Sequence, residues 1–289
     1  MHVLITGASS GIGRETVLRL AADGHHVFAG VRRAADGESL RQASSGEMTP
    51  LLLDVTDAGQ IAAAAQDVAE HVGGSGLDGL VDNAGIGVTW PLELIPLDEF
   101  RRQFEVNVVG QLAVTQAFLP LLRRASGRIV IIGSIGDRLT VPFGGALAAS
   151  KKAVSALADA LRMELAPWDI RVVLVEPASI HTEAVGKLER DARRAVEQFS
   201  SEGRELYQDA YLTMISAMAA MERRGSPPRV VADAVATALT ARHPHARYLV
   251  GKDARRLATL AGLPTPLLDT VRRRIFHLPA PGSRRSDAP

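Results

Sequence analysis

The stretch Thr6-Gly7-Ala8-Ser9-Ser10-Gly11-Ile12-Gly13 follows a short apolar run, residues 2–5, and opens a helical pattern that continues to residue 22. A glycine-rich turn between a strand and a helix lets the backbone approach a pyrophosphate, and the helix N-terminus directs free N–H groups at the anion. The spacing G-x-x-x-G-x-G differs from the P-loop pattern, and no Gly-Lys-Ser/Thr follows. The turn therefore predicts a phosphate-binding site and disfavours a nucleoside triphosphatase.

Apolar runs of strand length alternate with longer helical patterns beyond this turn. We expect strands at residues 2–5, 26–31, 49–53, 77–81, 128–132, 171–175 and 248–250, and helices near residues 13–22, 58–72, 97–123, 148–165 and 228–242. Nearly uninterrupted apolar strands are typical of a parallel sheet that helices cover on both faces. Right-handed crossovers then predict an α/β fold, a single Rossmann-like doubly wound parallel sheet of about seven strands.

Charge and composition exclude several classes of protein. Lys plus Arg number 33 against 32 Asp plus Glu, for a net charge of +1, which argues against a nucleic-acid partner. The chain has no Cys, so disulfides, thiolate zinc sites and cysteine nucleophiles are excluded, and we predict no metal site. No apolar run reaches the roughly 18 residues of a spanning helix, and no secretory signal is recognisable. We therefore expect no transmembrane segment and a cytoplasmic location.

The chain is expected to form one dinucleotide-binding domain, residues 1–278, with a helical lid insert at about residues 183–227 and a disordered tail at residues 279–289. One face of the second helical pattern in the insert carries Leu206, Tyr207, Ala210, Tyr211, Met214, Ile215, Met218 and Met221. Such a face suits a lid over a bulky apolar ligand, and equally suits ordinary core or subunit packing. Arg272, Arg273 and Arg274 form either a solvated helix end or a membrane contact.

The glycine turn and several later motifs resemble the short-chain dehydrogenase/reductase family over essentially the whole chain. The matching pieces after the turn are Asp54-Val55, Asp82-Asn83-Ala84-Gly85, Asn107 in Val-Asn-Val-Val-Gly, Ser134, Lys151 in Ala-Ala-Ser-Lys, and Pro177 with Ile180 and Thr182. Two small departures are Asp82, where Asn is common, and Ala178, where Gly usually follows the proline. The resemblance implies a nicotinamide-dependent oxidoreductase.

The resemblance also implies the residues that would bind the coenzyme. Asp54 and Val55 would meet the adenine, Asn83 to Gly85 would flank the coenzyme, and Thr182 would hold the nicotinamide carboxamide. The full set is Gly7, Ser9, Ser10, Gly11, Ile12, Gly13, Arg32, Arg33, Asp54, Val55, Asn83, Ala84, Gly85, Lys151, Pro177, Ile180 and Thr182.

Two arginines decide the expected coenzyme. Arg32 and Arg33 follow the second strand, where an acidic residue would bind the ribose 2′-hydroxyl of NAD. Guanidinium groups suit the 2′-phosphate of NADP, because they form charge-assisted and often bidentate contacts. We therefore expect NADP(H) in preference to NAD; the alternative is two surface arginines without a role.

The catalytic residues implied by the resemblance are Asn107, Ser134 and Lys151, together with a Tyr thirteen residues after the Ser and four before the Lys. Both counts arrive at Leu147, so an isobutyl group stands where the family has its proton-donating phenol. General acid catalysis is worth about 10²–10⁴ in rate, and Leu supplies none of it. Ser134 can still donate to the developing oxyanion, and Lys151 can act directly or through water. Weaker candidates for a replacement acid are Asp137, His181, Tyr207 and Tyr211.

Three functions remain open. The first is an NADP(H)-dependent ketoreductase or alcohol dehydrogenase with a bulky apolar small-molecule substrate and an atypical active site. The second is an NADP-binding protein without redox activity, such as a sensor or scaffold. The third is a non-redox isomerase or cyclase on the same fold. A homo-oligomer is possible in each case.

Overall fold

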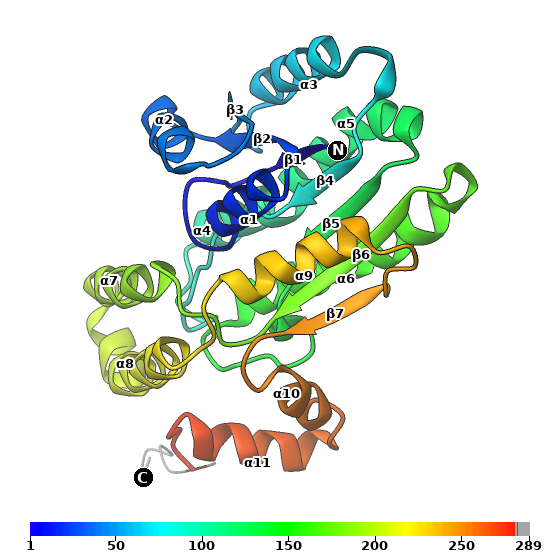
Figure 1. The fold of residues 1–289 in the computed structure, drawn as a ribbon. Helices are drawn as coiled ribbons and strands as arrows, with labels where there is room; N and C mark the ends of the chain where they lie inside the picture. Colours follow the sequence, from blue (N-terminus) through cyan, green and yellow to red (C-terminus); the bar gives the residue numbers. More distant parts are fainter. Residues whose placement is uncertain (281, 283–289) are drawn as a thin grey trace.

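A computed structural model describes residues 1–280 and 282, and its centre is a seven-stranded parallel sheet in the order β3-β2-β1-β4-β5-β6-β7 (Figure 1). The strands are β1 (His2–Ile5), β2 (His26–Val31), β3 (Met48–Leu52), β4 (Gly79–Asp82), β5 (Arg128–Ile132), β6 (Arg171–Pro177) and β7 (Arg247–Val250). The expected doubly wound sheet is confirmed. The predicted bounds hold for β1, β2 and β5 and shift by one or two residues elsewhere.

Helices cover both faces of the sheet, because successive strand residues point to opposite sides. Leu4 packs on one side with α3 (Ala58–Val72), α5 (Gln111–Ala125) and α6 (Gly145–Glu164). Val3 and Ile5 pack on the other side with α1 (Gly11–Ala22), α2 (Ala34–Ala43) and α9 (Arg229–Thr240) (Figure 1). Helix α2 is absent from the sequence prediction. Its apolar periodicity is weak, since only Gly37 and Leu40 in it are buried.

The predicted helix at residues 97–123 is a composite of three segments. Helix α4 (Leu97–Phe104) continues through a π-helical segment, Glu105–Gly110, into α5. The whole run, Leu97–Ala125, is long and apolar enough to cross a membrane by length and composition alone. In the fold, however, Val114, Phe118 and Leu122 in this run are fully buried in the core beside the sheet. These three apolar residues of the run therefore serve the interior of the domain, whereas Leu97 and Val109 are exposed.

The segment after β6 forms α7 (Ala184–Glu197) and α8 (Ser201–Arg223), which lie side by side at one end of the sheet (Figure 1). The predicted apolar face of α8 has two uses. Tyr211, Met214 and Ile215 are buried in a third cluster with Trp90 and Phe199, whereas Met218 and Met221 line a cavity described below. Helices α10 (Ala254–Leu260) and α11 (Thr265–Ile275) follow β7. Most of the predicted tail, residues 279–289, lies outside the described residues.

Candidate active site

The turn after β1 requires glycine at three positions. Gly7 and Gly11 have φ of +64° and +55°, the left-handed region that favours glycine. A Cβ on Gly7 would lie 2.8 Å from Ala84 Cα, and one on Gly13 would lie 2.3 Å from the Gly7 carbonyl oxygen. Ser9 and Ser10 are exposed beside this turn, and the first turn of α1 has no acidic residue. The N-terminus of α1 is therefore open and favourable to an anion.

Asn83 ties the end of β4 to the glycine turn. Its side-chain amide donates to the carbonyl oxygens of Thr6 at 2.9 Å and Gly7 at 3.0 Å. In return, the Thr6 hydroxyl accepts from the backbone N–H groups of Asn83 and Ala84, both at 3.0 Å. Asn83 therefore positions the turn, a role that its place in the motif does not by itself reveal. Gly85 follows, where a Cβ would lie 3.3 Å from Asn107 Oδ1.

The other predicted coenzyme residues meet the turn at the carboxyl edge of the sheet. Thr182, in the loop after β6, has its methyl group 3.6 Å from the position that a Cβ on Gly11 would occupy. Pro177 ends β6, and the buried Ile180 forms a bridge with Ser226. Asp54, after β3, accepts from the backbone N–H and the hydroxyl of Thr56 at 3.0 and 2.8 Å, and Val55 beside it is buried.

The two arginines after β2 differ in their partners. Arg33 forms a bidentate pair with Asp36, with N–O distances of 2.9 and 2.7 Å, and this hydrogen bond holds the pKa of Asp36 below its usual range. Arg32 is exposed and has no hydrogen bond or ion pair within residues 1–280 and 282. Asp36 lies on α2, the helix that the sequence prediction missed. Of the two guanidinium groups, Arg32 is thus the one available to a ligand.

A cavity of about 180 Å³ opens beside the predicted catalytic residues. Ser134, Leu147 and Lys151 line it from the β5–α6 region, and Leu147 and Lys151 stand four residues apart on one face of α6. Apolar side chains form most of the remaining lining: Met218 and Met221 from α8, Leu257 and Leu260 from α10, and Leu268, Val271 and Ile275 from α11. The cavity therefore combines a few polar side chains with a mainly apolar lining.

One polar residue of the cavity lining, Lys151, has an altered acidity. Burial of the ammonium lowers the pKa of Lys151 to about 8, and the negative charge of Asp137 acts in the opposite direction. Lys151 Nζ donates to the Ile132 carbonyl oxygen at 2.7 Å, so the ammonium is anchored at the end of β5. The Ser134 hydroxyl accepts from the Gly136 N–H at 3.0 Å and still has its own proton to donate.

Asn107 lies behind the cavity. It is fully buried in the π-helical segment. Asn107 Oδ1 accepts from the backbone N–H of Ile86 at 2.8 Å, and Asn107 Nδ2 donates to the carbonyl oxygen of Ile86 at 3.0 Å. Its amide also donates to the Ser150 hydroxyl at 3.1 Å, which in turn donates to the Leu147 carbonyl oxygen at 2.8 Å. Asn107 is thus a positioning residue that joins the loop after β4 to the first turns of α6.

The structure assigns other partners to three of the four weaker candidates for a proton donor. Asp137 is buried and lies 3.6 Å from Arg247 in an ionic cluster with Glu176. The Tyr211 hydroxyl donates to the Thr89 carbonyl oxygen at 2.8 Å, and the Tyr207 hydroxyl donates to Glu93. The fourth, His181, is exposed.

The cavity is also lined by an acidic residue, Glu222, which was not predicted from the sequence. Glu222 lines the cavity from α8, and burial raises the pKa of its carboxyl group above the usual range. Glu222 stands seven residues after Ile215 and four after Met218, so it lies on the same helix face as these apolar residues. An acidic residue on an apolar helix face was the sequence pattern that could have identified it. Besides Thr89, Ser179 and Arg272, the polar lining of the cavity therefore includes Ser134, Lys151 and Glu222, of which the last two have altered pKa values.

Comparison with known proteins agrees with this geometry. The sequence model of the family described as short chain dehydrogenase matches residues 1–193. The chain belongs to the short-chain dehydrogenase family. Human short-chain dehydrogenase/reductase family 9C member 7 is 36% identical over 285 residues, which cover 96% of this chain and 91% of that protein. Mouse retinol dehydrogenase 16 is 36% identical over 276 residues, or 93% of this chain and 87% of that protein.

Solved structures give the same result. A short-chain dehydrogenase from Streptomyces avermitilis superimposes with a TM-score of 0.73 at 28% identity and covers 96% of this chain and 95% of its own. A Burkholderia cenocepacia short-chain dehydrogenase in complex with NADP superimposes with a TM-score of 0.70 at 26% identity, covering 97% and 98% of the two chains. This short-chain dehydrogenase is therefore an oxidoreductase of that family, whose members use NAD or NADP. The three glycines, the open N-terminus of α1 and exposed Arg32 fit such a dinucleotide.

Proposed function

We propose that this short-chain dehydrogenase is an NADP(H)-dependent oxidoreductase for a bulky apolar alcohol or ketone, with Leu147 at the position of the family's catalytic Tyr. The observation that carries the proposal is the cavity in which Ser134 and Lys151 share one space with apolar side chains of α8, α10 and α11. A binding site of this kind orients an apolar molecule by a few polar groups at one end. Relatives named retinol dehydrogenase support an apolar alcohol as the substrate class.

The coenzyme would be held by the glycine turn, the end of β4 and the loop at Thr182, and it supplies or accepts the hydride. The chain's own residues must then supply the proton that a carbonyl oxygen gains during reduction. The Ser134 hydroxyl is placed to donate a hydrogen bond to that oxygen, which stabilises the developing negative charge. Lys151, whose pKa of about 8 keeps it mostly protonated at neutral pH, lines the cavity from the face of α6 that carries Leu147 and is the candidate cationic donor. Glu222 is the second candidate donor.

Preference for NADP rests on Arg32. An exposed guanidinium at the end of β2 that has no ion pair among the described residues matches a 2′-phosphate, whereas Arg33 is already neutralised by Asp36. We therefore assign the 2′-phosphate contact to Arg32 rather than to both arginines.

The test restores the missing phenol. Purified enzyme is assayed for NADPH oxidation with retinal, steroid ketones and aromatic ketones, and the Leu147→Tyr variant is assayed beside it. We expect a low rate in the natural chain and a gain of up to about 10²–10⁴-fold in the variant, because the phenol adds general acid catalysis next to Ser134 and Lys151. Leu147→Phe is the matched control, since it adds the ring without the hydroxyl. A Tyr variant that is no faster than the Phe variant, with NADPH still bound, contradicts the proposal.

Leu147 also favours a second candidate, an NADP-binding protein without redox activity. This function would be supported if the chain binds NADPH tightly, turns over no carbonyl compound, and keeps the same NADPH affinity in the Glu222→Gln variant. If Glu222→Gln instead abolishes a measurable reductase activity, the carboxyl group of Glu222 is the proton donor and the second candidate is excluded.

A further inference from the structure

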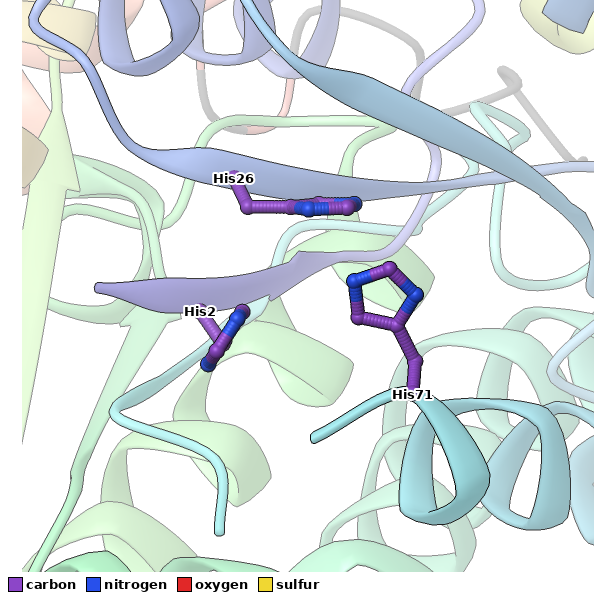
Figure 2. A group of neighbouring side chains, drawn as sticks. All are labelled: His2, His26 and His71. Carbon is purple, nitrogen blue, oxygen red and sulfur yellow. The ribbon is translucent and has the colours of Figure 1, made fainter. Parts of the chain in front are cut away.

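Three histidines from separate elements converge at the amino edge of the sheet, the edge opposite the coenzyme turn. His2 begins β1 and His26 begins β2, and the two residues are paired in the parallel register. Their side chains therefore point to the same face, where His71 arrives from the last turn of α3. One nitrogen of each ring lies within 4.8 Å of the others, and Figure 2 shows the three rings around a common space.

The residues around this histidine cluster fix the rings. His26 is 8% exposed, and its Nδ1 lies 3.1 Å from the Glu47 carboxylate while its Nε2 lies 2.9 Å from the Thr49 hydroxyl. A carboxylate on one ring nitrogen is the outer contact that orients metal-binding histidines in proteins. The Asp78 carboxylate accepts from the backbone N–H of His2 at 2.6 Å and so holds the first residue of β1 in place. The His26 and His71 rings meet edge to face with centroids 4.3 Å apart.

The chemistry of three imidazoles selects the ligand. Neutral imidazole is a borderline donor that binds Zn²⁺, Cu²⁺ and Ni²⁺ well and Mg²⁺ or Ca²⁺ poorly. With Zn–N bonds of about 2.0–2.1 Å, two nitrogens of a tetrahedral site stand about 3.4 Å apart. The present separation of up to 4.8 Å therefore has to contract by about 1.4 Å. Rotation of the exposed His71 and the half-buried His2 can supply this movement.

We propose that His2, His26 and His71 form a binding site for one Zn²⁺ ion, which water completes as the fourth ligand. On binding, one ring nitrogen of His26 exchanges its present hydrogen bond for the metal. The ion joins β1, β2 and α3, so its effect is to stabilise the amino edge of the sheet. The site is separate from the coenzyme turn because parallel strands place these two ends at opposite edges. The three residues are 24 and 45 positions apart in the chain, which is why no sequence motif reveals them.

The test is calorimetric titration of ZnCl₂ into the full chain carrying no histidine tag. We expect saturable binding of one ion per chain and, at free Zn²⁺ a hundredfold above Kd, a rise in Tm of about 5 °C. His71→Ala removes an exposed ligand, so the variant should melt like the natural chain without metal, lose the Zn²⁺-dependent rise in Tm, and bind at least ~10-fold more weakly. His2→Ala should behave in the same way.

His243→Ala is the matched control, because His243 is an exposed histidine on the loop between α9 and β7. This variant should bind Zn²⁺ as the natural chain does. Absorption of the Co²⁺-loaded chain supplies a second readout, since four-coordinate Co²⁺ has a far stronger visible spectrum than six-coordinate Co²⁺. Absence of saturable Zn²⁺ binding overturns the proposal, as does equal affinity in the natural chain and the His71→Ala variant. So does an equal loss of affinity in His243→Ala.

Discussion

Replacing Asp82 by Asn should stabilise this enzyme at neutral and alkaline pH. Asp82 ends β4 next to Asn83, and its side chain is 0% exposed. Oδ2 accepts from the Thr115 hydroxyl at 2.8 Å, while Oδ1 has no hydrogen-bond partner within residues 1–280 and 282. Burial raises the pKa of Asp82 to about 7, and the Thr115 hydrogen bond only partly opposes this. The folded chain therefore holds a proton that the unfolded chain releases above about pH 4.

The sign and size of the effect follow from this difference in proton binding. Between about pH 4 and pH 7 the folded state binds more protons than the unfolded state, so stability falls as pH rises, and above pH 7 the loss is complete. From 3.8 to about 7 is a shift of about 3 units, or at most about 4 kcal/mol at 1.36 kcal/mol per unit. Asn removes this loss but leaves a buried N–H that costs about 1–3 kcal/mol without an acceptor. We expect a net gain of about 1–3 kcal/mol at pH 8.

The assay is urea unfolding of the natural chain and the Asp82→Asn variant at pH 5 and pH 8. The difference in unfolding free energy between the two chains should be larger at pH 8 than at pH 5. Asp67→Asn is the control, because Asp67 is exposed on α3 and should leave stability nearly unchanged at both pH values. Parallel pH dependences for the natural chain and the Asp82→Asn variant would refute the reasoning.

Three further predictions concern the coenzyme turn and the cavity. Arg32→Ala should weaken NADPH binding by about 10-fold or more and leave NADH binding unchanged in a fluorescence titration, whereas Arg33→Ala should have the smaller effect. Gly13→Ala should abolish coenzyme binding and lower stability by about 1–3 kcal/mol in urea, because its Cβ would lie 2.3 Å from the Gly7 carbonyl oxygen. The rate of carbonyl reduction should fall as pH rises through the Lys151 pKa of about 8, and this step should vanish from the pH–rate profile of Lys151→Met.

Most of the fold could be predicted because the strands are buried on both faces. Residues 2–5, 26–31 and 128–132 are continuous apolar runs, and their predicted bounds match β1, β2 and β5. Helix α2 could not be found in the same way, since a surface helix with one large buried side chain, Leu40, has little periodicity to detect. The π-helical segment at Glu105–Gly110 was missed because its sequence continues the apolar pattern of the helices on either side.

In the candidate site, the placement of the residues could be predicted from the sequence, but the partners of their side chains could not. The glycine turn, Asn83 and Thr182 meet as expected, because the carboxyl ends of parallel strands share one edge. The hydrogen-bond partners of individual side chains could not be predicted from the sequence. No motif indicates that Arg33 pairs with Asp36 or that the Asn107 side chain is hydrogen-bonded to the backbone of Ile86. These pairings depend on how separate elements pack.

The placement of α10 and α11 has a consequence for how this enzyme can diverge. Residues 257–276 supply six apolar residues to the lining of the cavity, whereas the glycine turn and Lys151 come from the first 151 residues. Part of the cavity lining and the glycine turn thus belong to separate segments of the chain. We expect changes confined to the last two helices to alter the shape of the cavity while the glycine turn and Lys151 stay in place, and exchanging that segment between related chains would test whether it determines which molecule is accepted.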